Sequence, residues 1–295
     1  MEWLTKFPQL DDQYLSPIKR GIDTEFRMFT RTFGDSIESF FSPLQSLLIF
    51  FENFMTSTPW PIIVLGLGAI SWLATRSFKV VAGCTLALLA IGFLGMWEDT
   101  MKTISLILVC TFFSIAIGLP IGIVMSRSQR FQATVQPILD VMQTMPPFVY
   151  LIPVVMLLGI GRVPGFIAVV IYAVPPIIRL TNLGIRLVDK EVLEAADAYG
   201  CSKWQKLVKV QLPLALPTIM AGINQTIMMA LGMVVIAAMI GVQGLGQTVL
   251  QAIANQYFAS GILSGFAIVG IAIIFDRVSQ TYGRRLQRHR GGSHD

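Results

Sequence analysis

Long apolar stretches, separated by short polar segments, occupy most of the chain after residue 59. A membrane-spanning helix needs about 20 apolar residues, usually about 17 to 25. Lys, Arg, Asp and Glu are absent from Val80–Trp97, Thr103–Met125, Val141–Gly161, Val163–Ile178 and Val210–Phe275. The last stretch can hold two spans, and Trp60–Ala74 supplies one more when it includes its neighbours Pro59 and Thr75. The pattern therefore predicts an all-α, polytopic membrane protein with about seven transmembrane helices.

The charged residues are few and unevenly placed. They make up 13% of the 295 residues, against about 25% in a typical soluble domain. Of the 22 basic residues, fifteen fall in the loops and the tail of one side, and the short loops of the other side hold only Lys102 and Arg162. Because basic residues collect on the cytoplasmic side, we predict an external N-terminus and a cytoplasmic C-terminus. Basic groups at membrane ends do not form the surface patch that nucleic acid requires.

Three regions follow from these patterns. Residues 1–58 form an extracytoplasmic N-terminal segment, residues 59–280 the transmembrane domain with a long cytoplasmic loop at 182–217, and residues 281–295 a basic cytoplasmic tail. Within the first region, Ile37–Met55 is an amphipathic run. Such a run lies along the outer membrane interface or packs on the first span. The amide-rich segment 247–258, between the last two spans, is expected to dock an external partner or to seal the bundle.

Prolines divide two of the predicted spans. Met145-Pro146-Pro147 and Pro153 fall in one, and Pro164 and Pro175-Pro176 in the next. Each proline removes an intrahelical hydrogen bond and bends the helix. Broken helices in membranes often border a transport pathway, although they are also found as structural kinks alone.

The cytoplasmic loop carries clear signals for two short helices. Asp189 is a suitable N-cap, with Glu191 in the first turn, and Gly200 stops the first helix in a left-handed turn. Ser202 and Gln205 have the spacing of a capping box for the second helix, which we expect Leu212-Pro213 to end. We call these two helices and the turn between them, residues 189–211, the elbow. Its small residues Ala195 and Ala196 would let a partner surface approach closely.

This loop resembles a known motif. Glu194-Ala195-Ala196, three residues, Gly200, nine residues and Val210-Gln211-Leu212-Pro213 is similar to the EAA motif of ATP-binding-cassette (ABC) importer permeases. Val210 stands where the family usually has isoleucine. The resemblance implies that this loop docks into a groove of a separate ATPase, through six residues: Glu194, Ala195, Ala196, Gly200, Leu212 and Pro213.

Other segments resemble one branch of that family. Asp140–Leu151, Gln211–Gln225 and Gly244–Gln247 are similar to glycine betaine/proline betaine permeases, and the similarity covers roughly residues 60 to 280. It implies a type I importer permease fold in the cell inner membrane, and import of glycine betaine, proline betaine, choline or trimethylamine N-oxide. The implied partners are an ABC ATPase, an extracytoplasmic substrate-binding protein, membrane lipid and a second copy of the chain.

The chemistry of an enzyme is missing from the sequence. No Gly-x-x-x-x-Gly-Lys-Ser/Thr loop for ATP occurs, and the histidines, His289 and His294, both lie in the tail. We therefore expect no catalytic residue, metal site or cofactor in this chain, with ATP and magnesium bound by the partner ATPase.

Six residues are candidates for the translocation path: Pro146, Pro147, Phe148, Tyr150, Asn224 and Gln225. The faces of Phe148 and Tyr150 could bind a trimethylammonium group, or the rings could serve packing alone. Asn224 and Gln225 belong to the pathway or tie two helices together.

Two other classes of protein fit the composition. An ion-gradient-driven secondary transporter often has paired repeats and intramembrane charges, which are not seen in the central spans. A non-transporting membrane scaffold is the other alternative, and copurification of an ATPase would separate both from an importer.

Overall fold

The computed structural model describes residues 11–288 and is all-helical over that range. The predicted N-terminal segment and basic tail thus lie partly outside the described residues, at 1–10 and 289–295. The elements are α1 (Asp12–Ser57), α2 (Trp60–Thr75), α3 (Phe78–Phe93), α4 (Trp97–Arg127), α5 (Gln129–Thr144), α6 (Pro147–Leu158), α7 (Arg162–Arg186), α8 (Lys190–Ala198), α9 (Lys203–Lys206), the π-helical segment η2 (Leu207–Gln211), α10 (Leu212–Ala238), α11 (Leu245–Asn255) and α12 (Phe258–Arg288).

By length and composition, four helices in the described chain can each cross a membrane: α4, α7, α12 and the continuous run Lys203–Ala238. The bent pairs α1–α2 and α5–α6, with angles of 109° and 98°, raise the number to six. This is fewer than the seven spans predicted. The remaining one is α3, whose 16 residues extend for about 24 Å, less than the hydrocarbon core of about 30 Å.

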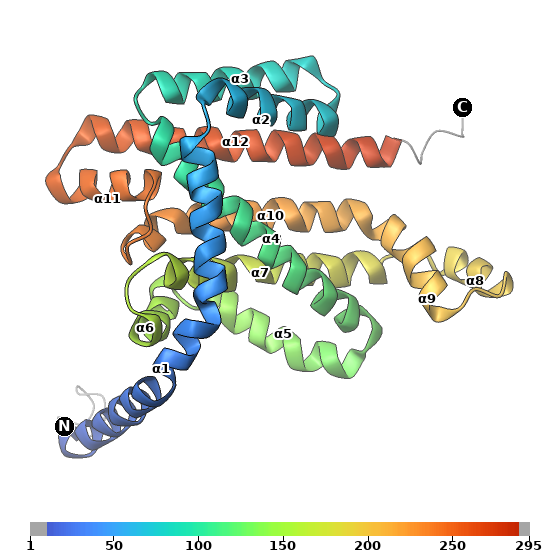
Figure 1. Ribbon diagram of the computed structural model, residues 1–295. Coiled ribbons are helices and arrows are strands. Elements are labelled where there is room, and N and C mark those ends of the chain that lie inside the picture. Colours follow the sequence, from blue (N-terminus) through green and yellow to red (C-terminus); the bar gives the residue numbers. More distant parts are fainter. Residues whose placement is uncertain (1–10, 289–295) are drawn as a thin grey trace, which may run out of the picture.

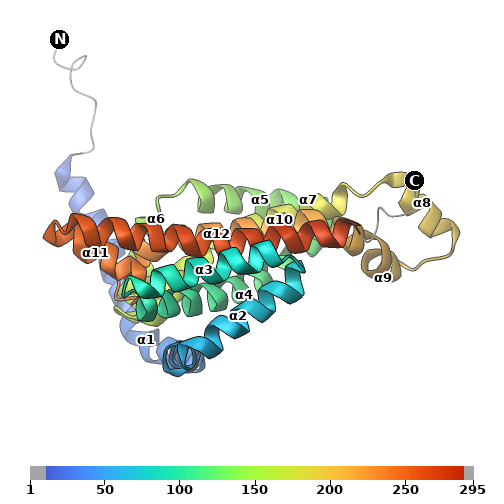
Figure 2. The ribbon, with the colours of Figure 1, turned by 90° about the horizontal axis from the view of Figure 1, so that it is seen from above.

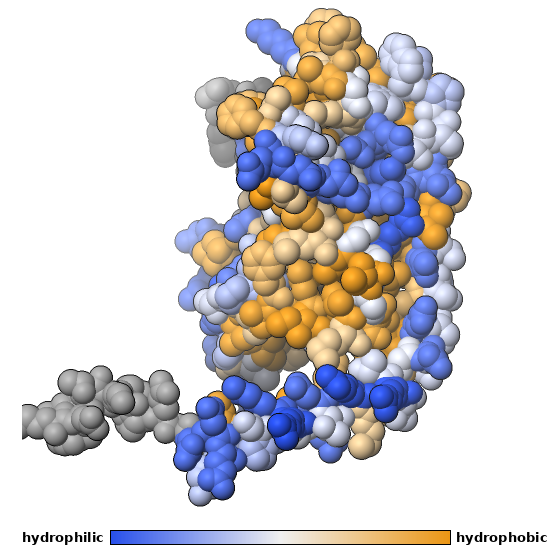
Figure 3. Space-filling view, turned by 90° about the vertical axis from the view of Figure 1, so that its left-hand side faces the viewer, coloured by the Kyte–Doolittle hydropathy of each residue, from blue (hydrophilic) through white to orange (hydrophobic). Residues whose placement is uncertain are grey.

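The long helices run between two distinct ends of the molecule. α8 and α9 lie at one end, together with the C-terminal part of α12 (Figures 1 and 2). α6 and α11 lie at the opposite end, where α1 crosses the bundle (Figures 1 and 2). We call these the elbow end and the α11 end. Figure 3 views the molecule from the α11 end and shows a band of hydrophilic side chains beside an apolar area.

The centre of the bundle is α7, which packs chiefly against α4 and α10. Two glycines of α4, Gly118 and Gly122, allow it to approach α7 closely. A Cβ atom on Gly122 would lie 2.6 Å from Thr181 Cβ and 2.8 Å from the Ile178 carbonyl oxygen. Such contacts are too short for any larger side chain, so these glycines set the α4–α7 spacing.

Only one of the predicted proline breaks is present. α5 ends before Pro146, and Pro147 begins α6 at the position where a missing N–H costs nothing. The prediction that Pro153 and Pro175-Pro176 interrupt their spans is wrong, because these prolines lie inside α6 and α7. Pro175 and Pro176 are buried in the tightly packed centre, where the neighbouring helices hold α7 in one piece. Pro164 falls in the first turn of α7, where it is tolerated.

The amphipathic run in α1 packs against α4, α6 and α7. Leu48 is buried, and Leu44, Leu47 and Phe51 pack against the main core. Further toward the N-terminus the apolar side chains are exposed, for example Ile22 and Phe33. α1 therefore joins the bundle through its C-terminal half.

Candidate functional site

The first helix of the elbow has the ends that its sequence predicted. Asp189 Oδ1 accepts a hydrogen bond from the Glu191 N–H at 3.0 Å, and α8 ends at Ala198 with Tyr199 as its C-cap. Gly200 then adopts φ +73°, and a Cβ atom built on it would meet nothing within 4 Å. Glycine is favoured here by the left-handed backbone and not by lack of space.

The second helix begins with the predicted capping box. The Ser202 hydroxyl accepts from the Gln205 N–H at 3.3 Å, and Gln205 Oε1 accepts from the Ser202 N–H at 2.9 Å. The prediction that Leu212-Pro213 ends this helix is wrong. The Leu212 N–H donates to the Leu207 carbonyl, and this π-helical turn passes directly into α10 with Pro213 in its first turn. The loop between α7 and the continuous helical run Lys203–Ala238 therefore comprises residues 187–202. It is shorter than the predicted loop 182–217.

Polar contacts hold the elbow together and attach it to the bundle. Lys206 Nζ lies 2.6 Å from Asp197 Oδ1, joining α9 to α8. Arg127, the last residue of α4, donates from Nη2 to the Lys203 carbonyl at 2.9 Å. Arg186 donates to the Met125 carbonyl at 3.0 Å and so links α7 to the same end of α4. The elbow is therefore fixed on α4 as well as on the helices that it connects.

The elbow presents an exposed, partly aromatic surface. Glu194 and Ala195 are exposed, whereas Ala196 is buried at 8% exposure. Ala196 thus packs inside the elbow, and the expectation that both alanines face a partner is wrong for this one. Tyr199 is 90% exposed and Trp204 67%. These two rings were not predicted from the sequence, although large aromatic residues beside the turn of a polar loop are a usable signal for a protein interface.

Leu212 and Pro213, the last two predicted coupling residues, are half-buried at the start of α10. They lie where the elbow joins the membrane-spanning helix. This position suits transmission of movement better than direct contact with a partner.

The candidate path residues separate into two groups. Tyr150 is buried and its hydroxyl donates to the Met142 carbonyl, across the break between α5 and α6. Phe148, next to the break at Pro146-Pro147, is 51% exposed. Tyr150 therefore holds the bend, which favours the packing interpretation for this ring, while Phe148 presents its face to the outside of the single chain.

Asn224 and Gln225 lie on a different surface, beside a cleft between α10 and α12. Asn224 Nδ2 donates to Asp276 Oδ1 at 2.8 Å, and Gln225 is exposed. The structure does not bring Phe148 or Tyr150 to this cleft. Asp276 was not predicted from the sequence, because it directly follows the charge-free stretch Val210–Phe275 and so stands where a span would be expected to end.

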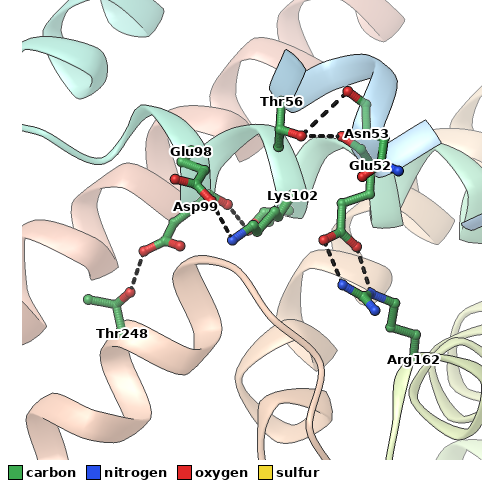
Figure 4. A network of polar contacts seen from close by, with 9 residues as sticks. Glu52, Asn53, Thr56, Glu98, Asp99, Lys102, Arg162 and Thr248 are labelled. Atoms are coloured by element: carbon green, nitrogen blue, oxygen red, sulfur yellow. Dashed lines mark hydrogen bonds and ion pairs between the residues drawn. The ribbon is translucent and has the colours of Figure 1, made fainter. Parts of the chain in front are cut away.

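A polar network ties the elements of the α11 end together (Figure 4). Arg162, at the start of α7, donates to both carboxylate oxygens of Glu52 in α1, at 2.8 and 2.9 Å. Thr248 in α11 donates to Asp99 in α4 at 2.8 Å. α11 also buries Leu245 and Gly246 in the bundle while Gln251 remains exposed. One face of the amide-rich segment thus seals the bundle and the other is open to a partner.

Comparison with known proteins decides the family. Residues 114–288 match the family of binding-protein-dependent transport system inner membrane components. The chain belongs to this family. It is a multi-pass permease of the inner membrane, and the family description implies a substrate-binding protein and an ATPase as its partners. The family match favours an importer permease over the two alternatives that the composition left open, a secondary transporter and a non-transporting scaffold.

Several curated permeases are similar over most of their length. The glycine betaine/proline betaine transport system permease protein ProW of Escherichia coli is 48% identical over 82% of this chain and 68% of its own. The glycine betaine/carnitine transport permease protein GbuB of Listeria monocytogenes is 47% identical over 77% and 81%. The glycine betaine transport system permease protein OpuAB of Bacillus subtilis is 42% identical over 90% and 93%.

A solved structure supports the fold of this permease. An inward-facing form of the MetNI methionine ABC transporter has a chain that matches 63% of this one and 92% of its own, with a TM-score of 0.55 and 23% identity. The predicted type I importer permease fold is confirmed.

Proposed function

We propose that this permease imports small quaternary amines of the glycine betaine type, as half of a homodimer driven by a separate ABC ATPase. The observation that carries the proposal is the 42–48% identity to three permeases whose names share glycine betaine. Proline betaine, choline and trimethylamine N-oxide belong to the same solute class, since each has a methylated nitrogen with a fixed or polarised positive charge.

The elbow would couple the permease to ATP hydrolysis. Its exposed face, with Glu194, Ala195, Tyr199 and Trp204, would sit on the ATPase, while the Gly200 turn sets the angle between its helices. Movement of the ATPase would then pass through α9 and η2 into α10, because no break separates them. One elbow per chain and two ATPases per transporter favour a symmetric pair of permeases.

The orientation follows from charge. Most of the basic residues are found toward the elbow end or in the tail, so this end would face the cytoplasm. The α11 end, with the crossing helix α1, would face outward. Its exposed apolar side chains, Ile22 and Phe33 among them, suit a helix that lies along the outer membrane interface.

Transport in a reconstituted system tests the solute class. The permease, its ATPase and its binding protein would be placed in lipid vesicles, and ATP-dependent uptake of labelled glycine betaine, proline betaine, choline and trimethylamine N-oxide measured. We expect uptake of at least one of the four. Uptake of none of them, together with uptake of an amino acid such as methionine, would contradict the proposal.

Single cysteines test the orientation. After Cys84, Cys110 and Cys201 are replaced by serine, one cysteine is introduced at Asp35 in α1 or at Ala198 in α8, both exposed positions. An impermeant thiol reagent applied to intact cells should label the first and not the second. The opposite labelling pattern would reverse the orientation.

A further inference from the structure

A cleft of about 670 Å³ lies between α10 and α12, within the range of about 300–1,000 Å³ typical of small-molecule sites. Asn224, in its wall, is twelve residues from the start of α10, or about 18 Å along the helix. On α12 the cleft runs from Asp276 to Gly283, the last residue of the span Phe258–Gly283. The cleft therefore starts at the elbow end of the two helices and reaches into the span as far as Asn224 and Met228. Polar side chains from both helices line it, including Gln225, Ser279 and Gln280.

Asp276 is the charged group of this cleft. It is the only acidic residue between Asp197 and the C-terminal Asp295. Its Oδ1 accepts from Asn224 Nδ2 at 2.8 Å and from Gln280 Nε2 at 2.6 Å. Oδ2 has no hydrogen-bond partner within residues 11–283, and the carboxylate is half-buried. Two amides thus hold the side chain in place while its negative charge is not balanced by a cation of the described residues.

Further polar atoms at the cleft wall lack partners. Asn224 Oδ1 and Ser279 Oγ are buried and make no hydrogen bond within the described part of the chain. Buried polar atoms are usually paired, and a charge in a membrane span faces the bundle interior or a water-filled cavity, where it marks a solute or ion route. Lipid cannot satisfy this surface.

We infer that this cleft is a binding site for the quaternary ammonium group of the transported solute, with Asp276 as its counter-ion. A quaternary ammonium has no N–H, so it is recognised by charge and by apolar contact. Asp276 supplies the charge, and the thioethers of Met220 and Met228, which also line the cleft, supply polarisable contacts for the methyl groups. Asn224 acts as a positioning residue, since it fixes the carboxylate. The inference rests on the proposed import of quaternary amines.

The site would discriminate between solutes of one class by their net charge. Choline carries a positive charge alone, whereas glycine betaine also carries a carboxylate, which is repelled by Asp276. The amide of Gln225 and the hydroxyl of Ser279 can donate to that second group. Asp276 should consequently contribute more to the binding of choline than to that of glycine betaine.

Equilibrium binding to the permease–ATPase complex in nanodiscs, without the binding protein, tests the site. Labelled choline and glycine betaine are the probes, and dimethylbutanol, the neutral carbon isostere of choline, is an unlabelled competitor. In Asp276→Asn we expect choline binding to weaken about tenfold and glycine betaine binding about threefold, with competition by dimethylbutanol unchanged. Asp276→Glu should retain most of the binding, and Asp35→Asn, which removes an exposed carboxylate of α1, should behave like the parent.

Three results would overturn the inference. The first is that the parent binds neither probe, and the second is that Asp276→Asn binds both as the parent does. The third is an equal loss for both probes accompanied by dissociation of the two permeases in size-exclusion chromatography, which would make the cleft a subunit contact. Uptake assays in vesicles separate these results from failure of the proposed function. If the parent complex imports glycine betaine, the function stands whatever the binding experiment gives.

Discussion

Lys206 Nζ donates to both carboxylate oxygens of Asp197, at 2.6 and 2.7 Å, and this pair joins the two elbow helices beside the Gly200 turn. Asp197 precedes the turn and Lys206 follows it, so the pair fixes the angle between α8 and α9. The elbow is thus a pre-formed unit and does not depend on a partner for its shape.

Loss of this pair should weaken coupling without affecting insertion. The Asp197 side chain is 57% exposed, and exposed ion pairs contribute at most about 1 kcal/mol. In Lys206→Met, which keeps an apolar stem, we therefore expect solute-stimulated ATP hydrolysis to fall about two- to fivefold, with normal amounts of permease in the membrane. The exchange Asp197→Lys with Lys206→Asp should restore part of the loss, and no recovery would indicate that the pair has no structural role.

Gly200→Ala should impair transport through the backbone alone. Its φ of +73° costs a residue with a Cβ about 1 kcal/mol or more. Gly265 in α12 is a matched control, because a Cβ atom at either position meets nothing within 4 Å and only Gly200 has a positive φ. We expect uptake to fall in Gly200→Ala, and further in Gly200→Val, while Gly265→Ala transports like the parent. Equal uptake in all of these variants would show that transport does not depend on a left-handed backbone at Gly200.

The aromatic rings on the elbow should be the main contacts with the ATPase. Exposed aromatic residues that become buried in an interface often contribute about 2 kcal/mol or more. Tyr199→Ala and Trp204→Ala should each reduce the amount of ATPase that copurifies with the permease, and Glu194→Lys should do so by reversing the charge. Phe258→Ala is the control, since Phe258 is 80% exposed at the opposite end. The proposal of an elbow interface fails if the elbow variants retain the ATPase as well as this control does.

The ion pair between Glu52 and Arg162 should stabilise the α11 end. It has two hydrogen bonds, and the Glu52 side chain is only 16% exposed. Arg162→Gln leaves this carboxylate without its partner, so we expect a loss of about 1–3 kcal/mol, seen as a lower Tm in detergent. Glu52→Gln should cost less, and the double variant Glu52→Gln, Arg162→Gln less than the sum. Strict additivity in this double-mutant cycle would mean that the two side chains do not interact.

Local signals explain what could be predicted from the sequence. The Ser202–Gln205 capping box and the turn at Gly200 depend on residues within one helical turn, and both are present as expected. The sequence also predicts the break at Pro146-Pro147, because two consecutive prolines directly after Met145 cannot continue α5. In each case the determining atoms are close neighbours along the chain.

Tertiary contacts explain the features that could not be predicted from the sequence. Ala196 is buried within the elbow, where α8 contacts α9, and no local pattern distinguishes it from Ala195. Pro213 does not end the helix, because a π-helical turn places it at the start of α10. Asp276 gains its position from Asn224, which is 52 residues away, so its place in a cleft was not visible from sequence spacing.

The continuous run from Lys203 to Ala238 makes α9, the second helix of the elbow, and a wall of the proposed solute site parts of one rod. It contains 36 residues and is about 54 Å long. A rod of this length acts as a lever. A tilt imposed at Trp204 displaces Asn224, in the middle, and the end of α10 on which α11 packs. Each displacement is proportional to the distance from the pivot. Arg127, which holds the rod at the Lys203 carbonyl, lies close to where that pivot would be. Small movements of an ATPase at the short arm of the lever would then produce larger movements at the α11 end of the bundle.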